Sequence, residues 1–73
     1  MHPATAALLR FFECGHLPPN LQVVVGPFAR LAREVAEGPE NAEATVCLRK
    51  LLEAKDCAVR AHLVLQPGGS AAS

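Results

Sequence analysis

Hydrophobic residues recur every three or four positions along most of this 73-residue chain, which is the spacing of an amphipathic α-helix. Breaks rich in proline and glycine divide the pattern, so it predicts three helices. Their expected ranges are 3–14, 19–37 and 41–65. We therefore expect an all-α fold, in which a short N-terminal helix packs on a long antiparallel helical hairpin formed by the two longer helices.

The first predicted helix leads into a rigid link. Pro3 suits the first helical position, where its missing N–H would have no partner anyway. Gly15 suits the left-handed conformation that often ends a helix. Pro18 and Pro19 restrict the backbone of the link that follows. We expect the second helix to begin near Pro19, with His16 held beside its start.

A glycine and a proline interrupt the second predicted helix. Pro27 lacks an N–H and clashes with the carbonyl four residues earlier, which bends or breaks a helix. The apolar stripe keeps its phase on both sides of Gly26 and Pro27, so we expect a kink and not a break. The sequence leaves open whether this kink contributes to a pocket or only curves the helix around a core. The helix should end at Gly38.

The third predicted helix carries its charges in the segment LRKLLEAKDCAVRA, which starts at Leu48. Lys55 falls in the apolar seam of this helix, between Leu52 and Val59. Either its methylene stem packs while the ammonium reaches water, or the ammonium faces a bound anion. The local pattern favours the first interpretation, because lysines at the edge of an apolar seam are common.

Other charges of this segment are spaced for ion pairs. Arg49 and Glu53 are four residues apart, and so are Asp56 and Arg60. Side chains at this spacing lie on the same face of a helix. We expect both pairs to form on the surface. Asp56 has a second possible role, which is to hold Arg60 in one rotamer for a ligand.

The length and composition predict one small domain, residues 1–65, followed by the disordered tail QPGGSAAS at 66–73. The three cysteines are odd in number and have no spacing that favours disulfides or, with the histidines, a metal site. A domain of this size buries a modest share of its surface. Since 51% of the residues are hydrophobic, we expect exposed apolar helix faces that drive homo-oligomer formation.

Charge and hydropathy exclude several classes of partner. The net charge is zero, so no overall field attracts duplex nucleic acid. No apolar run approaches the ~20 residues that span a membrane, and the N-terminus does not have the pattern of a signal peptide. We expect a soluble protein that stays where it is made and binds any anion locally.

The chain shows no catalytic motif. It lacks G-x-S-x-G, H-E-x-x-H and a glycine-rich phosphate loop. We therefore expect a binding protein and not an enzyme. In an oligomer, basic side chains of neighbouring copies would converge on shared clefts, where phosphates bind. The candidates for phosphate are Arg49, Lys50, Lys55 and Arg60. Phe11 and Phe12 are candidates for stacking on a purine, with Phe12 as the first choice, although the core also needs these rings.

Part of the sequence resembles a family of small phage proteins. The shared pattern is H-L-P-x-x-L-Q, then P-F-x-x-L-A, then L-R-K-L-L-E-A-K-D-x-x-V-R, and it covers about residues 11–61. The members of this family are similar to the helical-hairpin cyclic-nucleotide sponges that phages use against the CBASS and Thoeris defences.

The resemblance implies a homo-oligomer, a hexamer in the best-known sponges, in the cytoplasm of the infected bacterial host. Such a protein holds cyclic di- or trinucleotides or a cyclised ADP-ribose without cleaving them, and it needs no cofactor. By position, the resemblance assigns ligand binding to His16 and to the charged residues of the last motif, Arg49, Lys50, Lys55, Asp56 and Arg60. It also favours an anion as the partner of Lys55. Gly26 stands just before Pro27, where relatives frequently have serine, which leaves the identity of the nucleotide open.

Two alternatives remain. The chain could be a structural or interaction module, a helical hairpin that oligomerises or caps a partner helix and whose charges serve only solubility. It could also be a small nucleic-acid binder that resembles a helix-turn-helix protein. The neutral net charge and the lack of a basic recognition face argue against the second alternative.

Overall fold

The computed structural model describes residues 2–64, which form three α-helices and no β-strand. The helices are α1 (Pro3–Arg10), α2 (Pro19–Ala36) and α3 (Ala42–Val64). The predicted all-α class is therefore confirmed. The predicted tail at 66–73 and the last position of the third predicted helix, residue 65, lie outside the described residues.

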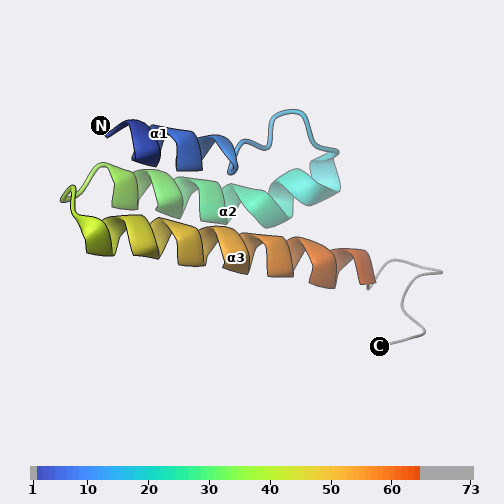
Figure 1. Ribbon diagram of the computed structural model, residues 1–73. Coiled ribbons are helices and arrows are strands. Elements are labelled where there is room, and N and C mark those ends of the chain that lie inside the picture. Colours follow the sequence, from blue (N-terminus) through green and yellow to red (C-terminus); the bar gives the residue numbers. More distant parts are fainter. Residues whose placement is uncertain (1, 65–73) are drawn as a thin grey trace.

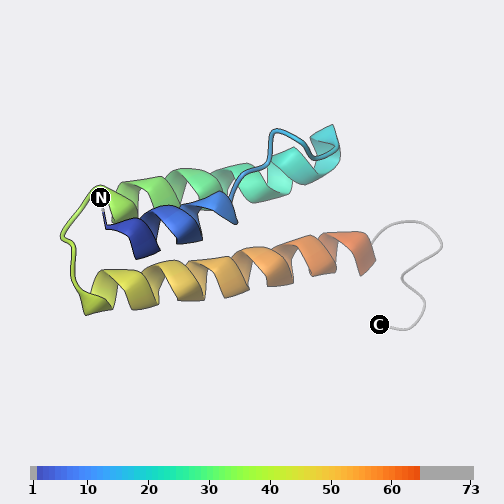
Figure 2. The same ribbon diagram turned by 45° about the horizontal axis from the view of Figure 1, so that its top comes forward.

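The two long helices lie side by side and run in opposite directions, joined by the turn 37–41 (Figure 1). The short helix α1 contacts both of them. Figure 2, turned by 45°, shows α1 lying over the pair on one side. The loop between α1 and α2 extends past the end of α1 and returns at the start of α2, above the C-terminal half of α3 (Figure 1).

The first helix begins as predicted and ends earlier than predicted. Pro3 occupies its first position, and the Nδ1 atom of His2 accepts a hydrogen bond from the backbone N–H of Ala4 at 3.0 Å. The helix stops at Arg10 and not at residue 14, because the next N–H groups bond three residues back and tighten the chain. This turn places Phe12 in the core. Gly15 does not adopt a left-handed φ.

The second helix follows the predicted path. Pro18 precedes it and Pro19 is its first residue. It continues unbroken through Pro27, and its axis changes direction along its length in Figure 1. The N–H of Glu37 closes the helix by bonding the carbonyl of Arg33. The prediction of one continuous helix, made from the constant phase of the apolar stripe on both sides of Pro27, is therefore confirmed.

The third helix has a defined start. The Oδ1 atom of Asn41 accepts a hydrogen bond from the N–H of Ala44 at 2.9 Å, which satisfies one of the unpaired donors at a helix N-terminus. Glu43 lies in the first turn, where a negative charge is favourable. None of the described helices is both long and apolar enough to cross a membrane.

The core is small and lies where the three helices meet. Leu48 of α3 and Ala32 of α2 are fully buried, and Ala36 and Phe12 are nearly so. The two alanines are small and allow the helix backbones to approach closely. The Phe12 ring completes the cluster from the side of α1. This ring anchors the start of the α1–α2 loop, which carries His16.

Candidate functional site

A hollow of about 400 Å³ lies between the α1–α2 loop, the N-terminal half of α2 and the C-terminal half of α3. We call it the loop cleft. The charged, polar and aromatic side chains that line it are Arg10, Phe11, Glu13, His16, Lys55, Asp56 and Arg60. Its apolar wall includes Leu21 and Val25 of α2 and Val59 of α3. Five of these residues were predicted from the sequence, namely Phe11, His16, Lys55, Asp56 and Arg60.

A glutamine that sequence reasoning missed holds the loop in place. The Nε2 atom of Gln22 donates to the carbonyl of Leu17 at 2.7 Å and lies 3.5 Å from the carbonyl of Gly15. The N–H of Leu17 bonds the carbonyl of Cys14. Gln22 therefore fixes the loop segment that carries His16. The signal was present in the motif H-L-P-x-x-L-Q, whose last residue is this glutamine.

Lys55 is held at the cleft by its neighbour. Its Nζ atom lies 2.8 Å from Oδ1 of Asp56, and its side chain is 14% exposed while that of Asp56 is 46% exposed. The methylene stem is packed and the ammonium reaches the cleft. Both interpretations of this lysine from sequence are compatible with the geometry, because the stem packs while the charge lines a hollow.

The predicted ion pairs at four-residue spacing do not form in the part of the chain that the structure describes. Asp56 pairs with Lys55 and not with Arg60. Arg60 instead donates from Nη2 to the sulfur of Cys57 at 3.3 Å. Arg49 and Glu53 are both exposed, where water competes with an ion pair. Asp56 therefore does not hold Arg60 in one rotamer, as the sequence suggested, and contacts Lys55 instead.

The two phenylalanines have different environments. The side chain of Phe11 is 62% exposed and lines the loop cleft. Phe12 is 2% exposed and packs in the core, so its ring has no free face for a base. Phe12 is therefore removed from the candidate site for this conformation, and Phe11 is the remaining aromatic surface.

Two further sequence candidates lie elsewhere. Arg49 and Lys50 are exposed on α3 and line none of the hollows described here. They were selected because they belong to the same charged segment as Lys55 and Arg60. Arg49 and Arg60 are about three helical turns apart and so lie on nearly the same side of α3, but at 1.5 Å per residue they are about 16 Å apart along its axis, which leaves Arg49 and Lys50 far from the loop.

A second hollow lies on the other side of the same loop. It measures about 590 Å³, and Arg30 and Arg33 of α2 line it together with Gly26 and the loop residues Glu13 and His16. We call it the arginine hollow. It shares Glu13 and His16 with the loop cleft, so the two hollows adjoin along the loop. The predictions from sequence did not include Arg30 or Arg33.

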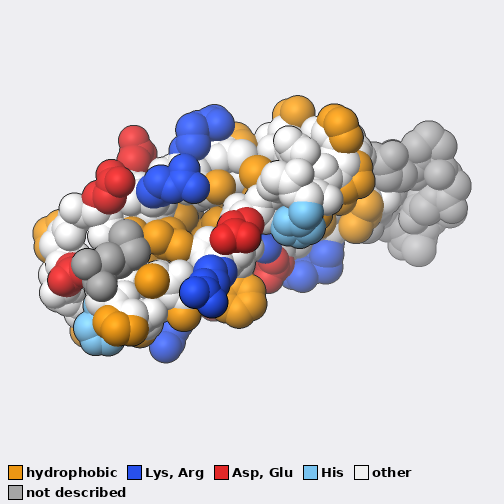
Figure 3. Space-filling model, turned by 90° about the horizontal axis from the view of Figure 1, so that it is seen from above, with side chains coloured by type: hydrophobic (Ala, Val, Ile, Leu, Met, Phe, Trp, Pro, Cys, Tyr) orange, Lys and Arg blue, Asp and Glu red, His pale blue; other side chains and the backbone are white. Residues whose placement is uncertain are grey.

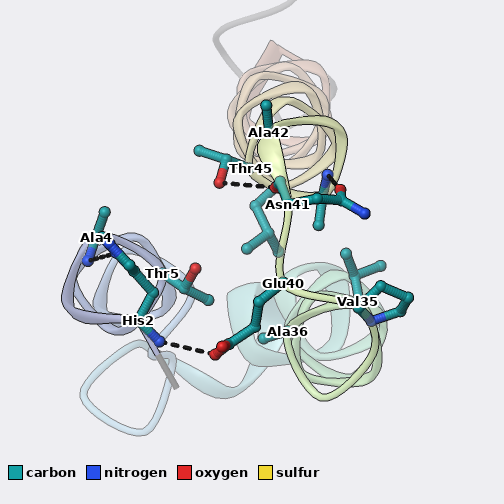
Figure 4. A pocket seen from close by; sticks show the side chains of 12 residues that line it. His2, Ala4, Thr5, Val35, Ala36, Glu40, Asn41, Ala42 and Thr45 are labelled. Atoms are coloured by element: carbon teal, nitrogen blue, oxygen red, sulfur yellow. Dashed lines mark hydrogen bonds between the residues drawn. The ribbon is translucent and has the colours of Figure 1, made fainter.

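A third hollow, of about 230 Å³, lies at the opposite end of the molecule, between the start of α1 and the turn 37–41 (Figure 4). The backbone N–H of His2 donates to Oε1 of Glu40 at 2.9 Å beside it. Small ligands usually occupy sites of ~300 Å³ or more. Because it is smaller and presents a carboxylate, this hollow does not suit an anion.

The charges of this neutral chain are unevenly distributed. Of its seven lysines and arginines, five line the two hollows beside the loop, namely Arg10, Arg30, Arg33, Lys55 and Arg60. Four of the acidic residues, Glu34, Glu37, Glu40 and Glu43, lie at or near the turn between α2 and α3. In Figure 3, basic side chains lie across the middle of the visible face, and acidic ones lie at its left end and also among the basic ones in the middle. The local field at the loop therefore favours anions.

No protein family, curated protein or solved structure matches this chain. The chemistry of the loop cleft must therefore carry the functional argument. Within residues 2–64, no group of three or more histidine, cysteine, aspartate or glutamate side chains is placed to hold a metal ion. What the cleft does offer is three cations, two carboxylates, an exposed aromatic ring and an imidazole around one hollow. Its excess of positive charge and its ring are suited to binding a phosphate-bearing aromatic molecule.

Proposed function

We propose that this chain is a non-enzymatic binding protein that sequesters an immune signalling nucleotide, as a phage counter-defence sponge in the cytoplasm of the infected bacterial host. The observation that carries the proposal is the convergence of Phe11 and His16 with Lys55 and Arg60 in one hollow of about 400 Å³. That volume falls in the range of small-molecule sites. The ligand class is a cyclic di- or trinucleotide or a cyclised ADP-ribose.

Four side chains of the cleft have a defined role in the proposal. The guanidinium of Arg60 and the ammonium of Lys55 bind phosphate oxygens, since charge-assisted hydrogen bonds are the stronger ones in proteins. The exposed face of Phe11 stacks on a purine. Asp56 is a positioning residue, because its 2.8 Å contact orients Lys55. Sequestration needs affinity alone, so no group has to act as nucleophile or base.

The proposal includes assembly of a homo-oligomer, a hexamer by analogy with the sponges that the sequence resembles. Both long helices carry uncharged residues on the flank opposite the one that meets the loop, as the helical repeat places them. This apolar face consists of Val24, Phe28, Leu31 and Val35 of α2 with Leu51, Ala54 and Ala58 of α3. Each of these residues is exposed or half-buried in the single chain, and Phe28, Val35 and Leu51 also pack against the edge of the core. A second copy that covers this face would supply the burial that a small domain lacks.

A thermal-shift panel tests the proposal. The purified chain is melted alone and with each of a set of cyclic dinucleotides, cyclic trinucleotides and cyclised ADP-ribose. A ligand present at a hundred times its Kd stabilises the folded state by about 2.7 kcal/mol, which moves the melting temperature of so small a domain by many degrees. A panel without a single shift would sink the proposal.

The apolar face also favours a second candidate, a structural or interaction module without a small ligand. In that case assembly depends on the face, and the loop cleft is incidental. The double variant Lys55→Ala/Arg60→Ala separates the two functions. It abolishes the thermal shift if the chain is a sponge, whereas a module would show no shift in either protein.

A further inference from the structure

Arg30 and Arg33 form a cationic surface that the proposed function does not use. Both are exposed, three residues apart on α2, and both line the arginine hollow. Neither guanidinium makes an ion pair or a hydrogen bond within the part of the chain that the structure describes. Two arginines with unused donors beside one hollow are suited to bidentate binding of a phosphate.

The hollow exists because α2 has small residues under it. Gly26 and Ala29 lie on the same flank of the helix as the arginines and line the hollow. A Cβ atom at position 26 would lie 3.5 Å from Nη1 of Arg30. The guanidinium of Arg30 is therefore folded back beside the helix at the site of the glycine, and a larger side chain there would compete for the same space.

The loop supplies further donors on the other side of the hollow. Within the described chain, the backbone N–H groups of Cys14, Gly15 and His16 donate no hydrogen bond, whereas that of Leu17 bonds the carbonyl of Cys14. Gln22 holds this segment through the carbonyl of Leu17. A fixed loop with unused N–H groups opposite two arginines adds to the attraction for an anion.

The loop cleft and the arginine hollow are neighbours, since Glu13 and His16 line both. We propose that one ligand with at least two phosphates spans the loop, with one phosphate at Lys55 and Arg60 and the other at Arg30 and Arg33. The carboxylate of Glu13 opposes this binding only weakly, because it is exposed and screened by water. This inference rests on the proposed function and adds a second phosphate position to its site, since every ligand class proposed above carries at least two phosphates.

Isothermal titration of three proteins with two probes tests the inference. The proteins are the unchanged chain, Arg30→Ala/Arg33→Ala and Arg49→Ala/Lys50→Ala, and the probes are cyclic di-AMP and AMP. The last variant removes the same charge from a part of α3 that lines neither hollow. We expect the arginine variant to bind cyclic di-AMP about tenfold or more weakly. Its affinity for AMP, and both affinities of the control, should change less than about twofold.

Each other result overturns the inference. Equal binding of cyclic di-AMP by the unchanged chain and by the arginine variant means that the second position is not used, although the proposed function survives. Equal losses for AMP and cyclic di-AMP, or a matching loss in the control, mean that the arginines act only through the overall field. If the unchanged chain binds neither probe nor any other cyclic nucleotide, the proposed function fails and takes this inference with it.

Discussion

Lys55 is the residue at which packing and binding are most closely combined. Its stem lies against the apolar seam and its side chain is 14% exposed, while the ammonium contacts Asp56 at the cleft. The pattern from sequence identified the seam correctly. It did not identify the partner, because spacing rules favour residues three or four apart and Asp56 is the next residue in the chain.

Lys55→Met separates the two roles of this lysine. Methionine keeps the length and apolar stem of the side chain and removes only the charge. The lost ion pair is half-exposed and contributes little, so the free energy of unfolding should stay within about 0.5 kcal/mol of its original value. Nucleotide affinity should fall about tenfold. Urea denaturation and titration calorimetry measure the two quantities, and unchanged affinity would remove Lys55 from the site.

Asp56→Asn is the companion variant. It keeps the shape of the side chain and removes the carboxylate that orients Lys55. We expect a loss of nucleotide affinity of severalfold, smaller than that of Lys55→Met, because the ammonium remains present but samples more rotamers. A gain in affinity would instead show that Asp56 competes with the ligand for Lys55.

Among the helices, the prolines allowed the starts of α1 and α2 to be predicted from the sequence. Pro3 and Pro19 mark the first residues of α1 and α2, and Pro27 leaves α2 continuous. The end of α1 could not be predicted from local sequence, because it depends on the burial of Phe12 against residues of α2 and α3 that are distant in sequence. The arginine hollow was missed for a similar reason, since a loop that meets α2 only in the folded chain creates it.

Gln22 is the residue that joins the loop to α2, and Gln22→Glu tests this. Glutamate has the same shape but cannot donate to the Leu17 carbonyl, which accepts at 2.7 Å in the structure. We expect a loss of about 1–2 kcal/mol in stability and faster hydrogen exchange in residues 14–17. Val23→Ala is the matched control, because Val23 is 75% exposed on the same helix. Exchange that is equally fast in both variants would contradict the role of Gln22.

At the scale of the whole molecule, the apolar face on α2 and α3 is the feature that a single chain does not explain. Self-association was expected from the small size and high hydrophobic content, and the apolar face is the surface that we propose for it. Leu52, which lies in the same apolar seam as Lys55, packs against the core. A charge there would unfold the chain and would not report on assembly.

Leu31→Asp is the better test of assembly. Leu31 lies on the apolar face and is 45% exposed, so the folded chain tolerates a charge there. We expect light scattering to show a smaller species while circular dichroism remains helical. Val46→Asp is the control, because Val46 is 44% exposed on α3 and lies outside the face. An unchanged mass for Leu31→Asp would show that copies associate through another surface or not at all.

We propose that the chain binds a signalling nucleotide and releases it unaltered. Equilibrium dialysis against the cyclic nucleotide that gives the largest thermal shift, followed by heating of the protein and mass spectrometry of the ligand, tests it most directly. We expect depletion of free ligand by the unchanged chain, recovery of intact ligand after heating, and no depletion by Lys55→Ala/Arg60→Ala. A cleaved product, or equal depletion by that variant, would contradict it.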